Sequence, residues 1–308
     1  MPVETPGWIA ERLVTAAGAA DLVGRQFPRL RGATVEPLTE GWDNTVHLVE
    51  GRWVFRFPRR AVALAGVERE IAVLPRLAAR LPLPVPVPEF VGTPSTTYPW
   101  PFWGARLLPG RELPETALPD ARREPAARSV GAFLRALHDP DQVVAVGGEL
   151  PVDPMRRGDP GWRAPRARVI VDRLARRGLG QPHRVLRQFL DDAERLSPST
   201  EPPVVVHGDL HVRHLLVDDA GRATGVIDWG DLCLGDPAVD LSLAYAGFAG
   251  PARAALFAEY GAVPWHREVT ARVLAVFLSA ALAEYAASDG RPRLLREALV
   301  GLQRAVAD

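Results

Sequence analysis

Three histidines and one aspartate lie within eight residues of this chain, in the stretch HGDLHVRH. They are His207, Asp209, His211 and His214. Neutral imidazole and ionised carboxylate both bind zinc, so this spacing is compatible with a metal cluster. An aspartate in a loop can instead act as a general base and accept the proton of a substrate hydroxyl. The spacing alone leaves both chemistries open.

A second aspartate favours one of these chemistries. Asp228 ends the segment GVID, and residues 218–222, DDAGR, have the composition of a turn between two strands. Because a hairpin brings its ends together, Asp209 and Asp228 are predicted to meet at one end of it. Phosphoryl transfer uses such a pair: one carboxylate accepts the hydroxyl proton, and the other holds the magnesium ion that bridges phosphate oxygens. Magnesium prefers oxygen ligands.

The first third of the chain predicts a small antiparallel sheet with helices. We expect a helix over residues 6–20. Residues 34–41, 44–51 and 52–59 alternate apolar and polar side chains between glycine-containing turns, which predicts a three-stranded meander. Residues 67–81 then carry apolar side chains at helical spacing. The apolar face of that helix contains Val67, Ile71, Leu74, Leu77 and Leu81.

The remainder predicts a second, mainly helical domain. The proline-rich residues 81–90 are expected to be extended and to lead into an edge strand. Residues 100–110 are predicted to form a strand that ends at a Pro-Gly pair, and we place a domain boundary there, between domains 1–108 and 109–308. This order of elements predicts the α+β class. Apolar spacings of three and four predict helices over residues 121–139, 162–178 and 183–196.

Composition excludes several classes of function. The chain has 308 residues, 47% of them hydrophobic, and zero formal net charge, so its charge predicts neither nucleic acid nor a membrane as a partner. The single Cys233 and the absence of a secretory signal pattern predict a cytoplasmic protein. The run from Val273 to Ala287 is short for a membrane span and predicts a buried helix. No lysine occurs, which excludes Schiff-base chemistry by lysine and a Walker A loop.

The motifs resemble those of a known family. The stretch from His207 to His214 resembles the catalytic loop of the aminoglycoside phosphotransferase family and parallels the protein-kinase pattern H-R-D-L-x-x-x-N. Asp228-Trp229-Gly230 is similar to the kinase D-F-G, and GDPAVDLSLAY resembles the family's following segment. The resemblance extends from Thr34 to Tyr245. It implies a bilobal protein-kinase-like fold and an O-phosphotransferase that uses ATP or GTP and Mg²⁺.

The resemblance also implies roles for the loop residues. Asp209 would be the catalytic base, and His211 or Arg213 would contact the transferring phosphate unless they face solvent. Asp228 would bind magnesium with help from His214, which stands where the family usually has asparagine. Imidazole is a poorer partner than an amide oxygen for a hard cation. The chain resembles the macrolide 2'-phosphotransferase branch of the family here, because that branch also tolerates histidine at this position.

The nucleotide site is implied in the same way. Arg56 stands where kinases have the third-strand lysine, and arginine retains a charged, bidentate contact to phosphate. Its expected partner is Glu70, because Glu68 points to another helix face. Two further segments complete the expected site. The loop containing Gly41 and Asn44 would cover the nucleotide, and the main chain of Arg106, Leu107 and Leu108 would hold the base.

Other expectations concern structure and acceptor. We interpret Asp236 as a helix cap, Asp240 as a bracing residue and His207 as structural. The arginine-rich residues 156–187 argue against a polycationic acceptor. A bulky apolar acceptor such as a macrolide is one candidate, an aminoglycoside another, and a metabolic sugar or amino alcohol remains an alternative. The aromatic residues that favour an apolar acceptor are Trp162, Phe248, Phe257, Trp265, Phe277 and Tyr285.

Two alternative functions stay open at this stage. A nucleotide-binding pseudoenzyme would explain the replacements at positions 56 and 214, and a zinc hydrolase would use the histidine cluster. We expect a monomer or a homodimer.

Overall fold

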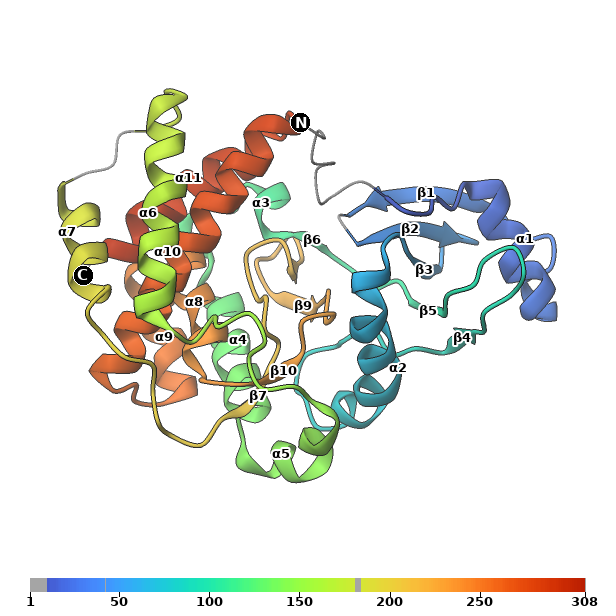
Figure 1. Cartoon of the computed structure of the whole chain (residues 1–308), viewed down its shortest axis with the longest axis horizontal. Coiled ribbons are helices and arrows are strands. Elements are labelled where there is room, and N and C mark those ends of the chain that lie inside the picture. Colours follow the sequence, from blue (N-terminus) through green and yellow to red (C-terminus); the bar gives the residue numbers. More distant parts are fainter. Residues whose placement is uncertain (1–9, 42, 181–183, 308) are drawn as a thin grey trace, which may run out of the picture. The chain divides into compact units, whose positions relative to one another are not determined.

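The computed structural model describes residues 10–41, 43–180 and 184–307, and it divides into two units (Figure 1). Unit 1 comprises Met1–Ala79 and Val85–Leu108, and unit 2 comprises Arg80–Pro84 and Pro109–Asp308. The chain therefore passes from unit 1 to unit 2 and back before it leaves unit 1 at Leu108. The brief excursion at residues 80–84 follows the end of a helix, and the sequence did not indicate it.

Unit 1 is built on a five-stranded antiparallel sheet with the order β1-β2-β3-β5-β4. The predicted meander and the predicted edge strand after the proline-rich segment are both confirmed, although the edge strand is only three residues long. The strands are β1 (Val35–Glu40), β2 (Asn44–Val49), β3 (Trp53–Pro58), β4 (Phe90–Gly92) and β5 (Phe102–Arg106).

The two faces of strand β3 explain how unit 1 packs. Side chains alternate across a strand, so Phe55 and Phe57 point to one face and Arg56 to the other. The phenylalanine face is fully buried in a core with helix α1 (Ala16–Gln26). The opposite face packs on helix α2 (Leu64–Ala78), through contacts such as Val67 with Trp103. Arg56 is therefore directed towards α2.

The first predicted helix was placed too early. Residues 6–9 lie outside the described residues, and residues 10–15 are not helical. Helix α1 begins at Ala16 because the Thr15 side chain caps it and accepts a hydrogen bond from the Gly18 N–H at 3.1 Å. The helix then continues to Gln26, six residues beyond the predicted end.

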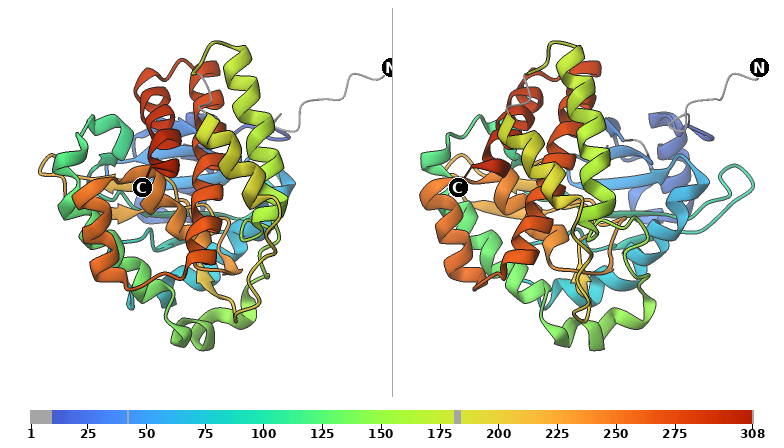
Figure 2. Two further views of the ribbon diagram at one scale, coloured as in Figure 1. Left: turned by 90° about the vertical axis from the view of Figure 1, so that its left-hand side faces the viewer. Right: turned by 60° about the vertical axis from the view of Figure 1, so that its left-hand side comes forward.

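Unit 2 is mainly helical, as the sequence indicated. Helix α10 lies at its centre and contacts α6, α8 and α11; Figure 2 shows α6, α10 and α11 running side by side. The α-helices are α3 (Leu113–Thr116), α4 (Glu124–Leu137), α5 (Pro140–Val146), α6 (Pro160–Arg176), α7 (Arg184–Ala193), α8 (Ala238–Gly247), α9 (Gly250–Tyr260), α10 (Trp265–Ser288) and α11 (Pro292–Val306). Short 3-10 helices cover Pro28–Leu30, Ala61–Ala63, Asp120–Arg122 and Gly147–Glu149.

Helix α10 is the one described helix with the length and apolarity of a membrane span. It has 24 residues, so it is longer than the apolar run suggested. More than half of its most apolar stretch is buried inside unit 2, where residues such as Val273 and Leu274 are shielded by the neighbouring helices. The expectation of a buried helix is confirmed.

Two small sheets in unit 2 carry the histidine-rich loop. Strands β8 (Leu215–Val217) and β9 (Ala223–Val226) form the predicted hairpin, and β6 (Arg111–Glu112) pairs with β8. Strand β7 (Val204–Val206), which enters the loop, pairs instead with β10 (Cys233–Gly235). The loop after β7 is thus held at both ends by separate sheets.

Candidate active site

The loop from His207 to His214 makes a sharp turn directly after strand β7. Gly208 adopts a left-handed φ of 89°, and a Cβ at this position would lie 2.1 Å from the carbonyl oxygen of Asp231. The buried carboxylate of Asp240, on α8, accepts hydrogen bonds from the N–H groups of His207 and Gly208 at 2.7 and 3.1 Å. Asp240 also lies 3.2 Å from Nε2 of His138. These contacts agree with a bracing role for Asp240.

Both ring nitrogens of His207 form hydrogen bonds. Its Nδ1 accepts from the N–H of Asp209 at 3.2 Å, so Nε2 carries the proton and donates to the carbonyl of Ile227 at 3.0 Å. Burial lowers the pKa of His207 to about 4, which keeps the ring neutral. Trp229 packs against the same ring at 4.6 Å between centroids. His207 is structural, as expected, and offers no lone pair to a metal.

Nδ1 of His211 also accepts a hydrogen bond from the backbone. Its Nδ1 accepts from the N–H of Arg213 at 3.3 Å, which leaves the proton on Nε2, 3.7 Å from a carboxylate oxygen of Asp209. Burial, together with His214 and Arg213, lowers the pKa of His211 well below its usual value. The neutral ring therefore presents an N–H to Asp209 and can orient that carboxylate.

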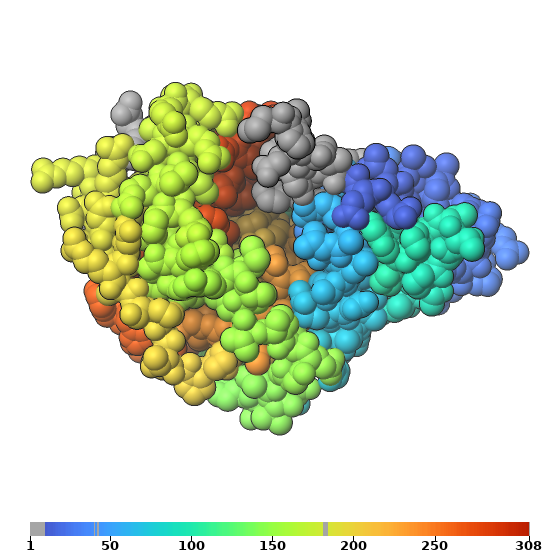
Figure 3. All heavy atoms as spheres, viewed as in Figure 1, coloured from blue at the N-terminus to red at the C-terminus, as the bar shows by residue number. Residues whose placement is uncertain are grey.

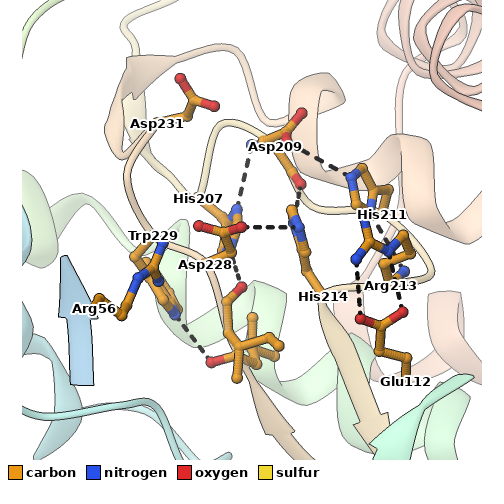
Figure 4. Close-up of polar contacts among 12 residues, drawn as sticks. Arg56, Glu112, His207, Asp209, His211, Arg213, His214, Asp228, Trp229 and Asp231 are labelled. Carbon is orange, nitrogen blue, oxygen red and sulfur yellow. Dashed lines mark hydrogen bonds and ion pairs between the residues drawn. The ribbon is translucent and has the colours of Figure 1, made fainter. Parts of the chain in front are cut away.

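His214 links the two aspartates of the predicted pair. Its Nδ1 donates to the main-chain carbonyl of Asp209 at 2.8 Å, and its Nε2 lies 3.3 Å from an Asp228 carboxylate oxygen (Figure 4). Burial lowers the pKa of His214, but the hydrogen bond and charge of Asp228 outweigh it, so the net shift is upward. The hairpin has brought both ends together, with an imidazole between them.

Asp228 itself has an unusual backbone. Its φ of 67° lies in the left-handed region, which costs free energy for a residue other than glycine. Asp228 lies two residues after the end of strand β9, and its half-exposed carboxylate reaches to 3.3 Å from His214. Strain of this kind is often found at functional sites.

The potential metal ligands form a group different from the one the sequence suggested. Ligand atoms of Asp209, His211 and His214 all lie within 4.8 Å of one another. A zinc site would need lone pairs from several of these rings, yet His207 and His211 already use theirs on backbone N–H groups. This geometry disfavours the zinc hydrolase.

Asp209 has the environment of a general base. Its carboxylate is mostly buried, with 23% of the side chain exposed, and burial raises its pKa to about 6 despite the opposing charge of Arg157. A base with a pKa near the working pH is effective in proton transfer. Arg157 lies 3.3 Å away, and the sequence did not single it out among its arginines.

Arg213 was predicted as a candidate for phosphate contact, and the structure gives it another partner. Its guanidinium is paired with the carboxylate of Glu112 through two hydrogen bonds of 3.1 and 3.2 Å, and it lies over the ring of Tyr285. Glu112 is on β6, the strand that pairs with the hairpin, so this ion pair holds the loop against the sheet. We therefore do not assign Arg213 to the reaction.

The expected nucleotide residues of unit 1 are partly brought together. Arg56 Nη1 and Glu70 Oε1 form a buried ion pair at 3.2 Å, and Glu70 also accepts from the Trp103 indole N–H at 3.2 Å. Glu70, rather than the exposed Glu68, is thus the partner of Arg56. The pairing confirms the predicted contact, while its role in nucleotide binding stays a prediction.

The loop between β1 and β2 is held by arginines of the segment after β3. The Gly41 carbonyl accepts from Arg59 at 2.9 Å, and Asp43 is paired with Arg60 at 2.5 Å. Asn44 begins β2, and its side-chain oxygen is buried without a hydrogen-bond partner among the described residues. Trp42 lies outside the described residues. A turn held in this way, with one unsatisfied polar group, suits a ligand loop.

Some groups of the segment expected to hold the base already form contacts within the protein. The N–H of Leu107 donates to the carbonyl of Arg52 at 2.8 Å, and the Arg106 side chain is paired with Glu89 at 3.0 Å. The Leu107 N–H is therefore not available to a nucleobase in this arrangement. Contacts from Leu108 and from the Leu107 carbonyl remain expectations.

Asp236 caps helix α8 from outside its first turn. Its carboxylate accepts from the N–H of Ala238, the first helical residue, at 2.8 Å, and it pairs with Arg267 at 3.1 Å. The helix-capping interpretation is consistent with this contact, although the residue at the N-cap position is Pro237.

Comparison with known proteins agrees with this geometry. The sequence profile of the phosphotransferase enzyme family (APH) matches residues 34–275. Viomycin phosphotransferase of Streptomyces vinaceus is 29% identical over 295 residues, which is 91% of this chain and 96% of that protein.

Two solved structures show the same similarity. The structure of macrolide 2'-phosphotransferase type I is 27% identical, with a TM-score of 0.57, and the match covers 94% of this chain and 98% of that one. The GDP and kanamycin complex of APH(2")-IIia has a TM-score of 0.64 at 22% identity, over 93% and 97% of the two chains. The first supports relationship, and the second shows likeness of fold.

Proposed function

Since this chain belongs to the phosphotransferase enzyme family and is a phosphotransferase acting on an alcohol group of a small molecule, we propose that it transfers the terminal phosphoryl group of ATP or GTP to a hydroxyl of an antibiotic. The observation that carries the proposal is the Asp209 carboxylate, with its pKa raised to about 6, on a loop braced by Asp240. The fold class is that of the kinase-like relatives.

Asp209 would accept the proton of the acceptor hydroxyl as the reaction proceeds. The hydroxyl oxygen forms a bond to the terminal phosphorus, and the bond from that phosphorus to the nucleoside diphosphate oxygen breaks. The nucleoside diphosphate leaves, and the proton on Asp209 passes to solvent. His211, whose N–H faces the same carboxylate, would hold Asp209 in the orientation that this transfer needs.

Asp228 and His214 are the residues that would hold magnesium. Asp228 supplies carboxylate oxygens, which suit a hard cation, while His214 offers a nitrogen that such a cation binds less readily. When bound, magnesium neutralises phosphate charge and orients the phosphoryl group.

Nucleotide binding is proposed for unit 1. Arg56, fixed by Glu70, would contact the phosphates, and the loop from Gly41 to Asn44 would cover them. The main chain of residues 106–108 would contact the base. Structures of the same fold hold GDP in one case and ADP in another, which supports a guanine or adenine nucleotide as donor. Because such donors are made inside cells, we propose a cytoplasmic location.

Mass spectrometry tests the reaction directly. Macrolides, aminoglycosides, viomycin and small amino alcohols are incubated with the protein, magnesium and either ATP or GTP. We expect one acceptor to gain a phosphoryl group, and Asp209→Asn to lower the rate by at least about 100-fold because general-base catalysis contributes that much. Full turnover in Asp209→Asn would overturn the role of this carboxylate. Absence of any phosphorylated acceptor would count against an antibiotic substrate.

A further inference from the structure

Arg157 is the basic side chain that contacts the proposed catalytic base. Its Nη2 lies 3.3 Å from Oδ1 of Asp209 and 3.1 Å from Oδ2 of Asp231, and its side chain is only 12% exposed. His211 faces the other oxygen of Asp209, Oδ2, at 3.7 Å. The Asp209 carboxylate therefore has a permanent cation on one side and, on the other, the N–H of a neutral ring at a distance longer than a hydrogen bond.

The segment that carries Arg157 is built to present it. The Asp153 carboxylate accepts hydrogen bonds from the N–H groups of Arg157 and Gly158, both at 2.8 Å. Asp153 and Arg156 have positive φ values of 22° and 51°, and the Asp153 N–H donates to the Leu234 carbonyl at 2.8 Å. Two strained residues beside one arginine indicate a position fixed by its surroundings rather than a loose surface loop.

Helix α6 anchors the other end of this segment. Asp159 caps the helix by accepting from the Trp162 N–H at 3.0 Å, and it pairs with Arg156 at 2.5 Å. The buried Arg163 donates to the main-chain carbonyls of Met155 and Arg156. In Figure 3 the chain around residues 150–180, in yellow-green, forms a broad part of the visible surface of unit 2.

The charges around Asp209 have a consequence for the acceptor. The acceptor hydroxyl must reach the Asp209 carboxylate, and Asp231 is the next carboxylate beside it (Figure 4). Two carboxylates side by side would attract an ammonium group. Arg157 contacts both carboxylates and offsets one of their two negative charges, and its own positive charge would repel an ammonium group placed beside it.

We propose that Arg157 is a positioning and acceptor-selecting residue: it orients the Asp209 carboxylate and excludes ammonium groups from the space beside Asp209 and Asp231. The acceptor then presents an uncharged or anionic group next to its reacting hydroxyl. This inference rests on the proposed function and narrows its substrate class.

Equilibrium binding tests the selection without turnover. Calorimetry compares the affinities of two probes. Kanamycin has charged amines, whereas fully N-acetylated kanamycin keeps the hydroxyls and lacks the charge. We expect the full-length protein to prefer the acetylated probe, and Arg157→Gln to shift the preference about tenfold towards kanamycin, because a like charge beside the amine is removed. Arg157→Lys should keep the original preference. Arg176→Gln, which changes an exposed arginine at the far end of helix α6, is the control.

Kinetics tests the positioning. With the best neutral acceptor, Arg157→Gln should lower kcat about tenfold and leave the KM for nucleotide unchanged, whereas Arg157→Lys recovers most of the loss. If the original protein and Arg157→Gln show the same preference between the two probes, Arg157 does not select the acceptor. The same conclusion follows if neither probe binds. An unchanged kcat in Arg157→Gln overturns the positioning. A protein that transfers phosphate to no acceptor, yet shows the expected shift in binding, would instead refute the proposed function.

Discussion

At the scale of single residues, hydrogen-bond partners give each histidine of the loop a different task. His207 and His211 both accept backbone N–H groups on Nδ1, while His214 donates from Nδ1 and turns Nε2 towards Asp228. Three identical side chains within eight residues therefore comprise one structural ring, one orienting donor and one ring at the proposed metal site. The motif alone does not distinguish them, because tautomers depend on neighbours.

The pH dependence of activity follows from Asp209. A base must be deprotonated to act, and burial raises the pKa of Asp209 to about 6, so activity should be full above this value and fall below it. We expect log(kcat/KM) to decrease with a slope near one below about pH 6. Stopped assays from pH 4.5 to 8, with thermal denaturation at each pH, separate this effect from unfolding. A profile flat down to pH 5 would contradict the assignment.

At the scale of elements, the loop after β7 depends on a close backbone approach. Gly208→Ala would place a methyl group 2.1 Å from the Asp231 carbonyl, at a φ unfavourable for alanine. We expect a loss of about 2 kcal/mol or more in the free energy of unfolding, together with a marked loss of kcat. Chemical denaturation and steady-state kinetics measure these.

Gly148→Ala is the matched control for this loop. That glycine has no atom within 4 Å of an added Cβ and no left-handed φ, so stability and activity should stay close to those of the original protein. Equal behaviour of the two variants would show that the tight turn is not required.

Strand β3 and helix α2 act together in unit 1. Alternation puts Arg56 on the helix-facing side of β3, and helical spacing puts Glu70 opposite it, at 3.2 Å. Glu70→Gln removes the charge that holds Arg56, so we expect the KM for nucleotide to rise about tenfold, with smaller effects on kcat. Glu68→Gln, on an exposed face of the same helix, should leave both constants unchanged. A similar KM for nucleotide in the two variants would show that the pair of Arg56 and Glu70 is not needed for nucleotide binding.

At the scale of the whole molecule, an ion-pair network joins distant parts of the chain within unit 2. Glu297 on α11 pairs with the buried Arg123 and Arg304, both at 2.6 Å, and Arg304 also pairs with Asp120 at 2.6 Å. Burial by itself raises the pKa of Glu297, but its bonds to the two arginines outweigh this and lower it. The network thus links the start of α4 to the last helix.

Removing the Glu297 charge should destabilise unit 2. Glu297→Gln leaves the two buried arginines with Asp120, which lies 3.5 Å from Arg123 and 2.6 Å from Arg304, so we expect a loss of about 3 kcal/mol, the lower end of the cost of breaking a buried pair. Because the folded-state pKa is depressed, the stabilisation is present above the unfolded value and is lost as the pH falls through the folded value. Thermal denaturation at pH 7 and pH 4 should therefore show a smaller difference between variant and original protein at pH 4.

Glu259→Gln provides the comparison for this network. Glu259 pairs with an exposed Arg128 at 3.6 Å, and exposed pairs contribute about 0–1 kcal/mol. If both substitutions lowered the stability equally, the buried network would contribute no more than an exposed ion pair.

The sequence by itself determined the features that depend on local spacing. Period-two alternation set the faces of β3, the turn DDAGR set the hairpin, and the hairpin brought Asp209 and Asp228 to His214. Only the tertiary structure decided which of the many arginines meets Asp209. It also paired Arg213 with Glu112, 101 residues earlier in the chain, and β7 with β10. Local patterns follow from backbone geometry, whereas these long-range partners are selected by packing, which leaves no periodic signature in the sequence.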